Sequence, residues 1–192
     1  MLDISSEAQA MPPIGDGSIS TIIREPSGVT INVHTNIAPG AYTVWLLVWN
    51  DPSQCTNVGA TNCLPPPAGG SDVPDSIMFG TGQVVPSSGR GDFAVHLPVG
   101  DTDRLIIGGT LQTGLTNAVG SEIHVILRHH GDALPDALEA QITLPAGACD
   151  VNTCADLQGG AHVPGAATPE IMRLEDVQAL LDRVAARLGL RP

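Results

Sequence analysis

The sequence contains no lysine, and only 3% of its 192 residues are Phe, Trp or Tyr. Its formal net charge is −12, and an acidic chain of this kind repels phosphate backbones and anionic lipid. No apolar run approaches the roughly 20 residues that a membrane-spanning helix needs. Nucleic acid is therefore not expected as a partner, and no segment is expected to span a membrane.

Familiar catalytic and nucleotide-binding motifs are also missing. The chain has no G-x-S-x-G nucleophile elbow, no P-loop and no G-x-G-x-x-G fingerprint. It also lacks the H-E-x-x-H and C-x-x-C spacings that mark many zinc sites and dithiol redox sites. The sequence therefore carries no strong catalytic signature.

The four cysteines form two closely spaced pairs. Cys55 and Cys63 are eight residues apart, and Cys149 and Cys154 are five apart, each in a stretch rich in turn-forming residues where the chain can fold back. Two local disulfides are favoured among the three possible pairings. Because disulfides persist in oxidising compartments, we expect a secreted or periplasmic protein. No apolar leader precedes these residues, and Met1 is interpreted as a start placed before a mature chain.

Short apolar stretches separated by turns predict an all-β fold, since the chain holds 22 Gly and 16 Pro scattered between them. Residues 1–18 are expected to be a loose lead-in. Residues 19–165 are expected to form a β domain, either an antiparallel sandwich, a jelly roll or a small barrel. The run 41–50 is apolar almost throughout and predicts a strand buried on both faces. The predicted strands are 19–24, 29–35, 41–50, 77–79, 82–85, 92–97, 121–129 and 140–144, with 104–108 as a further candidate.

Residues 168–189 are predicted to form a C-terminal amphipathic helix. Thr168 suits the N-cap and Pro169 suits the first helical position. The helix either packs on its own domain or serves as a dimerisation arm. Along it runs an apolar stripe with alternating steps of three and four residues: Leu174, Val177, Leu181, Val184 and Leu188.

Three histidines, His34, His96 and His124, lie on different predicted strands, and each points opposite to the apolar side chains of its strand. Because side chains alternate between the two faces of a strand, each strand presents one apolar face and one face bearing a histidine. If the three strands are neighbours, the imidazoles converge and leave an open coordination position, as in a catalytic zinc or type 2 copper site. Otherwise they are unrelated histidines on a solvated sheet face.

Two further residues complete the metal hypothesis. Glu122 shares a face with His124 and is expected to act as a catalytic base, as a fourth ligand or as a carboxylate that orients the imidazole. His162 follows the second cysteine pair among glycines, where it is either an additional ligand or base or a surface-loop residue. Copper or zinc is favoured over calcium, because imidazole suits copper and zinc whereas calcium takes oxygen ligands.

Two weaker patterns involve Asp92. Arg90-Gly91-Asp92 spells the integrin-type tripeptide, but its surroundings favour a hairpin turn. Asp92 and Glu122 would form a carboxylate pair for glycoside cleavage only if the fold brought them together.

The sequence thus supports two functional hypotheses. The first is a secreted metal-binding protein that acts as a mononuclear copper or zinc enzyme, in which the metal activates water or dioxygen. The second is a non-enzymatic extracellular binding or adhesion module, in which the long loop 51–76 makes the contacts and the C-terminal helix oligomerises.

Overall fold

The computed structural model describes residues 18–56, 63, 72–106, 113–144, 154–165, 170–173 and 175–176. Most of the regular structure in these residues is β-strand, as the sequence predicts. The strands are β1 (Ile19–Glu25), β2 (Gly28–Asn36), β3 (Gly40–Trp49), β4 (Ser76–Val85), β5 (Arg90–Pro98), β6 (Glu122–His129), β7 (Ala155–His162), β8 (Glu170–Arg173) and β9 (Glu175–Asp176). The helices are a short 3-10 turn, η1 (Pro52–Gln54), and α1 (Leu138–Thr143).

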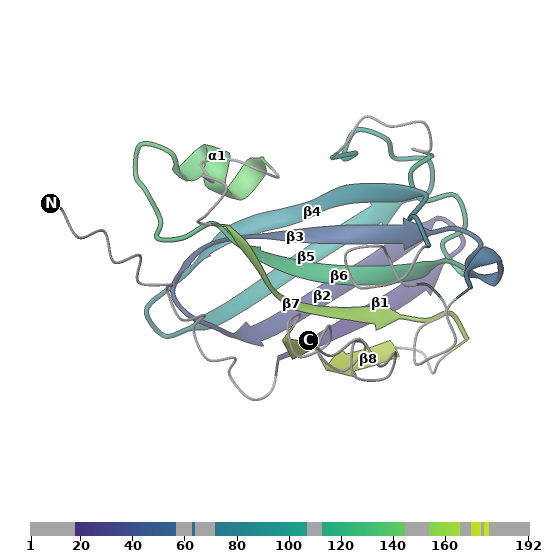
Figure 1. Cartoon of the computed structure of the whole chain (residues 1–192), viewed down its shortest axis with the longest axis horizontal. Coiled ribbons are helices and arrows are strands. Elements are labelled where there is room, and N and C mark those ends of the chain that lie inside the picture. The colour runs from purple at the N-terminus through teal and green to yellow at the C-terminus, as the bar shows by residue number, and fades with distance from the viewer. Residues whose placement is uncertain are drawn as a thin grey trace, which may run out of the picture.

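The strands form two antiparallel sheets that lie one behind the other (Figure 1). Sheet A has the order β5-β2-β1-β8, and sheet B has the order β4-β3-β6-β7-β9. At two places consecutive strands are the edge strands of different sheets: β4 is followed by β5 on one side of the sandwich, and β8 is followed by β9 on the other. The result is a sandwich-like fold.

One apolar core fills the space between the sheets. Sheet A contributes alternating residues such as Val29, Ile31 and Val33, and sheet B contributes alternating residues such as Leu46 and Val125. All of these are fully buried, because every second side chain of each strand faces the other sheet. The alternation in the sequence therefore predicts correctly which side chains of these strands face the core.

Strand β3 is buried on both faces, which confirms the prediction for the run 41–50. Only Trp45 among its ten residues is partly exposed. Tyr42, Val44 and Leu46 face the core, whereas Leu47 and Trp49 belong to a second apolar cluster on the opposite face of sheet B. Sheet B is therefore covered on its outer side as well.

Two predicted elements have a different secondary structure. Part of the predicted C-terminal helix is extended, because β8 pairs with β1 and β9 pairs with β7; residues 177–189 lie outside the described residues. The predicted strand 140–144 lies mostly in helix α1, which packs on β3 and β4. Its Leu, Glu, Ala and Gln residues are good helix formers. In the C-terminal segment, pairing with strands distant in the sequence outweighs the apolar pattern. In residues 140–144, local helix propensity outweighs it.

Strand β4 joins two segments that the sequence predicts as separate strands, 77–79 and 82–85. The pairing with β3 shifts register between Val44 and Trp45, so a bulge accommodates the interruption without ending the strand. A Cβ atom on Gly82 would lie 2.0 Å from the carbonyl oxygen of Ile142. Glycine at this position therefore lets α1 approach sheet B closely.

The candidate strand 104–108 forms only a bridge to β4. Leu105 pairs with Met78, and the backbone of residues 104–106 hydrogen-bonds to Ile77 and Phe79; residues 107 and 108 lie outside the described residues. Strand β7 was not predicted at all, since its two consecutive glycines, Gly159 and Gly160, are typical of a loop. No helix in the described part of the chain is long and apolar enough to cross a bilayer.

Candidate functional site

The three predicted metal-binding histidines are divided between the two sheets. His34 and His96 lie in sheet A, on β2 and β5, whereas His124 lies in sheet B, on β6. His96 is opposite Thr30, which lies four residues along β2 from His34. His34 and His96 are therefore roughly 13 Å apart along the strand direction. The predicted convergence is therefore wrong. Alternation fixes the face of a strand within its own sheet, but it does not say which sheet the strand joins.

No group of three histidine, cysteine, aspartate or glutamate residues with metal-binding geometry occurs within the described residues. The carboxylate pair considered for glycoside cleavage is likewise split, because Asp92 belongs to sheet A and Glu122 to sheet B. Each sheet must therefore be considered separately.

The outer face of sheet A, which we call the open face, is polar and solvent-accessible. Strand β5 illustrates the reason: its residues alternate strictly between exposed and buried. The exposed side chains of β1, β2 and β5 share one surface because their registers place them side by side. The open face consists of Thr21, Ile23, Thr30, Asn32, His34, Asn36, Arg90, Asp92, Ala94 and His96.

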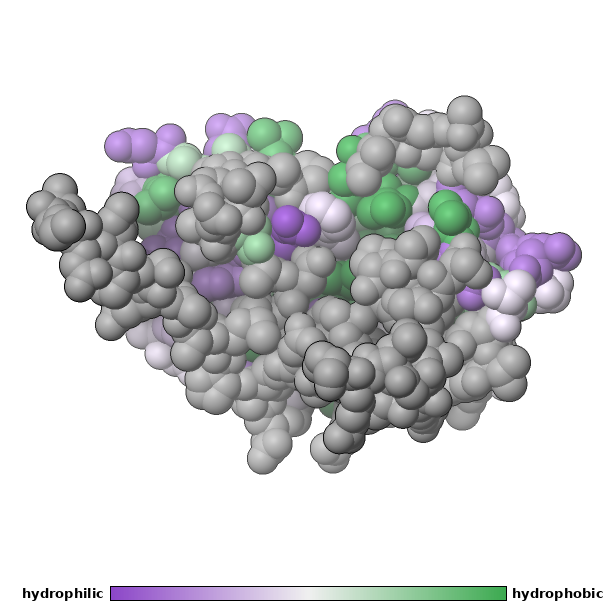
Figure 2. Space-filling view, in the orientation of Figure 1, coloured by the Kyte–Doolittle hydropathy of each residue, from purple (hydrophilic) through white to green (hydrophobic). Residues whose placement is uncertain are grey.

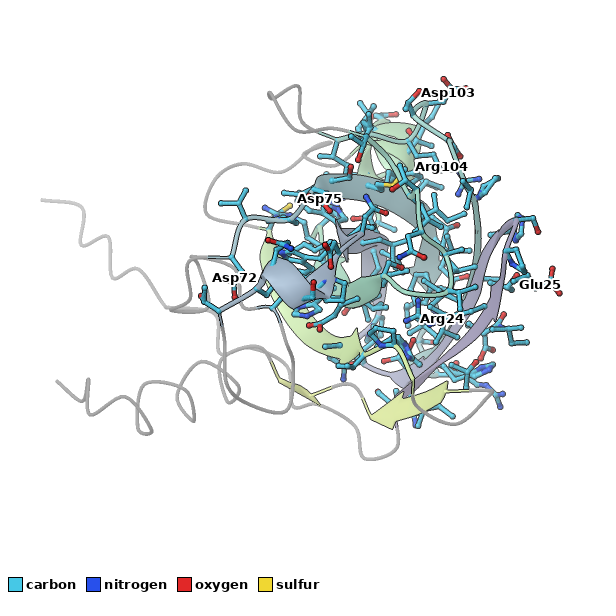
Figure 3. All side chains as sticks on the ribbon, turned by 90° about the vertical axis from the view of Figure 1, so that its right-hand side faces the viewer. Arg24, Glu25, Asp72, Asp75, Asp103 and Arg104 are labelled. Atoms are coloured by element: carbon cyan, nitrogen blue, oxygen red, sulfur yellow. A yellow bond between two sulfur atoms is a disulfide. The ribbon has the colours of Figure 1, made fainter. Side chains whose placement is uncertain are left out.

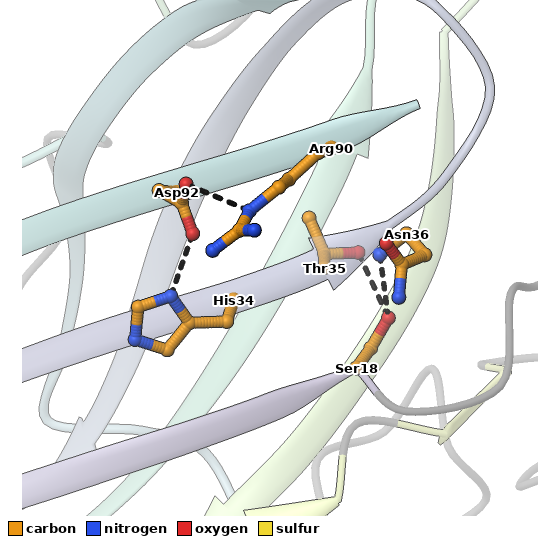
Figure 4. A network of polar contacts seen from close by, with 6 residues as sticks. All are labelled: Ser18, His34, Thr35, Asn36, Arg90 and Asp92. Atoms are coloured by element: carbon orange, nitrogen blue, oxygen red, sulfur yellow. Dashed lines mark hydrogen bonds and ion pairs between the residues drawn. The ribbon is translucent and has the colours of Figure 1, made fainter. Parts of the chain in front are cut away.

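A hydrogen-bonded group of three residues lies at one end of the open face (Figure 4). His34 Nδ1 is 2.6 Å from Asp92 Oδ1, and Arg90 Nε is 3.3 Å from Asp92 Oδ2. The hydrogen bond from His34 is the main cause of the lowered pKa of Asp92, and Arg90 adds to it. An ionised carboxylate only accepts hydrogen bonds, so Nδ1 carries the proton and Nε2 is directed away from Asp92.

The tripeptide Arg90-Gly91-Asp92 begins strand β5 instead of forming the predicted turn. The turn lies just before it, where Gly89 N–H donates to the carbonyl of Pro86. Arg90 and Asp92 bind each other across the buried Gly91, and Asp92 also binds His34. Both charged groups of the tripeptide are therefore engaged within the open face.

His96 repeats part of this arrangement at the other end of the face. Its Nδ1 lies 3.1 Å from the hydroxyl of Thr30 on the neighbouring strand. Both exposed imidazoles are thus held through Nδ1 by a cross-strand partner. A histidine oriented in this way presents Nε2 as a ligand or hydrogen-bonding atom.

The outer face of sheet B, which we call the covered face, holds the predicted catalytic residue Glu122. Glu122 has no exposed surface, and the side chain of His124 is only 12% exposed. His124 Nε2 lies 2.7 Å from Glu122 Oε1, and the amide of Cys63 donates to the same oxygen at 3.1 Å. Trp49 packs on the imidazole of His124 with ring centroids 4.5 Å apart. The pair is therefore enclosed, and its contacts are internal.

The covered face consists of Thr43, Trp45, Leu47, Trp49, Glu122, His124, Ile126 and Arg128.

The Cys55–Cys63 disulfide closes one end of the covered face and confirms the first predicted pairing. Helix α1 covers the other end, where Gln141 hydrogen-bonds to the backbone of His130, Asp132 and Leu134. Between them, Arg128 stacks over Trp45 at 4.7 Å. In Figure 2, which faces sheet B, hydrophobic surface gathers towards the β4 side.

His162 lies inside the sandwich and does not occupy a surface loop. Its Nε2 is 2.9 Å from the hydroxyl of Ser20, and Arg24 donates to its backbone carbonyl at 3.2 Å. Burial is the main cause that lowers the pKa of His162, and together with the charges of Arg24 and His124 it brings the pKa to about 4. A serine–histidine pair can serve as a nucleophile and base, but both side chains are buried here, so the pair is structural.

Two more histidines, His129 and His130, have structural contacts at the end of β6. His129 stacks on Tyr42 with ring centroids 4.6 Å apart, and burial lowers its pKa. His130 Nε2 is 2.7 Å from the hydroxyl of Thr43, and its Nδ1 is 3.5 Å from the sulfur of Cys154. Cys154 is disulfide-bonded; its predicted partner, Cys149, lies outside the described residues.

Charged side chains at one end of the sandwich order the loops there (Figure 3). Asp75 accepts a hydrogen bond from the amide of Asn50 at 2.7 Å, and Asp72 accepts from the amide and hydroxyl of Thr56, each at 2.9 Å. Arg104 pairs with Asp101 at 3.3 Å. These carboxylates therefore fix backbone positions.

No family model, no curated protein and no solved structure matches this chain. The function of the chain is therefore inferred from its own geometry. Within the described residues, Glu122, His130 and His162 are enclosed by internal contacts. The accessible groups with binding chemistry that the sequence predicted, His34, Asp92 and His96, lie on the open face.

Proposed function

We propose that this protein is a non-enzymatic extracellular binding module that recognises a macromolecular partner through the open face of sheet A. One observation carries this proposal. The accessible imidazole, amide, hydroxyl and carboxylate groups of three adjacent strands share a single sheet surface, with His34 and Asp92 held in a fixed geometry.

The shape of this surface favours a large partner over a small substrate. Small-molecule and catalytic sites are usually concave and partly apolar, whereas side chains standing on adjacent strands form a broad, gently twisted surface. Glu122 and His162, which have the chemistry of bases, are buried away from it. Recognition by many hydrogen bonds at once therefore suits the open face better than turnover does.

An extracellular location is part of the proposal. The Cys55–Cys63 disulfide supports it, because such bonds are rare in reducing compartments. The oligomerising helix considered from the sequence is not part of the proposal, since residues 170–173 and 175–176 pair as strands with the sheets.

The test compares three purified proteins on an array of polysaccharides and extracellular matrix proteins. The first is the wild type, and the second carries Asn32→Ala, His34→Ala and Asp92→Ala on the open face. The third is a control that carries Asp136→Ala, just before α1, and Glu139→Ala, within it, both at exposed positions. We expect a ligand that binds the wild type and the control at least tenfold more tightly than the open-face variant. Equal binding by all three proteins would place recognition elsewhere.

A second candidate function is weak copper or zinc binding by His34. Its specific support is the hydrogen bond from Nδ1 to Asp92, because metal-binding histidines commonly donate their other nitrogen to a carboxylate. A single imidazole supplies one ligand, so the ion would bridge His34 to a ligand of another chain. This replaces the three-histidine site, which the division between the two sheets does not support.

Titration with copper(II) and zinc(II), followed by calorimetry and sedimentation, tests this candidate. We expect metal-dependent association that His34→Ala abolishes and that His124→Ala, on the covered face, leaves in place. Association that survives His34→Ala would reject it.

A further inference from the structure

One end of the covered face depends on a single covalent link. The side chains of Leu47, Trp49 and Cys63 are buried together there, with Cys55 and Ile77 packed against them. Cys63 is fully buried, whereas Cys55 is partly exposed. The disulfide therefore anchors residue 63 over an apolar surface.

The same link positions a hydrogen-bond donor on a buried carboxylate. The backbone amide of Cys63 binds Glu122 Oε1, which also accepts from His124. A buried carboxylate is stable only while its hydrogen bonds are satisfied. Displacement of residue 63 would leave Glu122 short of one donor and draw water towards it.

The other end of the covered face lies under helix α1. Helix α1 packs on β3 and β4 and approaches β4 closely at Gly82, and its Gln141 makes three hydrogen bonds to the backbone of residues 130, 132 and 134, which follow β6. A local change at the disulfide end can therefore leave the helix end intact.

We propose that the Cys55–Cys63 disulfide is a redox-sensitive catch that keeps the Glu122–His124 pair and Trp49 enclosed. A dithiol reductant attacks the sulfur of Cys55, the more exposed residue of the two, the bond to Cys63 breaks, and the second thiol of the reductant then releases Cys55. Two electrons and two protons pass to the two cysteines, and the reductant becomes a disulfide. Residue 63 then leaves Glu122, and Trp49 and His124 become accessible to solvent.

Tryptophan fluorescence can follow this opening. The chain has two tryptophans, so the variant Trp45→Phe leaves Trp49 as the sole reporter, while phenylalanine keeps an aromatic ring beneath Arg128. Acrylamide quenching is measured before and after reduction with dithiothreitol. Alkylation and mass spectrometry report which cysteines have been reduced, and far-ultraviolet circular dichroism reports the sheets.

We expect quenching to rise at least twofold when Cys55 and Cys63 are reduced, with little change in the dichroism. A Cys149→Ser/Cys154→Ser variant should respond in the same way, and Cys55→Ser/Cys63→Ser should show the high value without reductant. The proposal would be overturned if a chain that has been reduced and alkylated at Cys55 and Cys63 showed the same quenching as the unreduced chain. Loss of the whole β signal would also overturn it, because the bond would then hold the entire fold and not one local contact.

Discussion

The two outer faces of this protein carry the same chemical pair in opposite surroundings. On the open face, His34 and Asp92 are 2.6 Å apart, and about half of each side chain is exposed. On the covered face, His124 and Glu122 are 2.7 Å apart, and the carboxylate has no exposed surface. The two distances are nearly equal, although His34 uses Nδ1 across two strands and His124 uses Nε2 within one strand, so we expect burial to be the main determinant of how strongly each pair affects stability.

Removal of the two carboxylates is the most direct way to test this comparison. Glu122→Ala is expected to lower the free energy of unfolding by about 3–5 kcal/mol, because it leaves a buried imidazole and the Cys63 amide without their acceptor. Asp92→Ala should change it far less, since water replaces the carboxylate. Urea denaturation of both variants measures the difference. Equal losses would mean that the covered face is as hydrated as the open one.

The stability of the sandwich should depend on pH through the buried side chain of His162. The pKa of His162 falls from its ordinary 6.5 to about 4 in the folded chain, so the unfolded chain binds the proton more readily. Stability should be complete above about pH 6.5 and should decline as pH falls through about 4, by roughly 3 kcal/mol at most.

Thermal unfolding between pH 7 and pH 4 measures this loss. His162→Gln, which cannot gain a proton, should reduce the decline, although His129, whose pKa burial also lowers, acts in the same direction. His34→Ala on the open face is the matched control and should retain the decline. An equal decline in His162→Gln would show that other groups cause it.

The features of the fold that could be predicted from the sequence are those that depend on local patterns. Alternation in β2, β5 and β6 marks their core-facing residues correctly, and the continuous apolar run of β3 indicates its double burial. The short loop between Cys55 and Cys63 indicates their disulfide. Each of these signals lies within a few residues of the feature that it predicts.

The candidate site required information of another kind. His34 and Asp92 are 58 residues apart, and Ser20 and His162 are 142 apart, so only strand order brings them together. Nothing in the alternation of β6 indicates that His124 belongs to the sheet opposite His34. The strand β7 escaped prediction because Gly159 and Gly160 pair with β6 through backbone alone.

The helix end of the covered face should show an intermediate effect. Gln141 is fully buried and makes three hydrogen bonds to backbone groups. Gln141→Ala is therefore expected to cost about 1–3 kcal/mol, because it leaves buried polar groups unsatisfied. Asn32→Ala on the open face removes a side chain of similar polarity and should cost less. Chemical denaturation compares the two, and equal costs would contradict the assignment of α1 as a cover.

The smallest effect on stability should come from the centre of the open face. Ala94 is exposed and stands opposite Asn32 on the neighbouring strand, so Ala94→Arg is expected to change the free energy of unfolding by no more than about 0.5 kcal/mol. The new guanidinium would nevertheless stand in the middle of the proposed binding surface and block a partner that contacts both strands. Denaturation midpoints and array binding of the same preparation separate these effects. If a fully stable Ala94→Arg protein bound the partner as tightly as the wild type, the open face would not be the recognition surface. The loops would then be the next candidates for the contact with the partner.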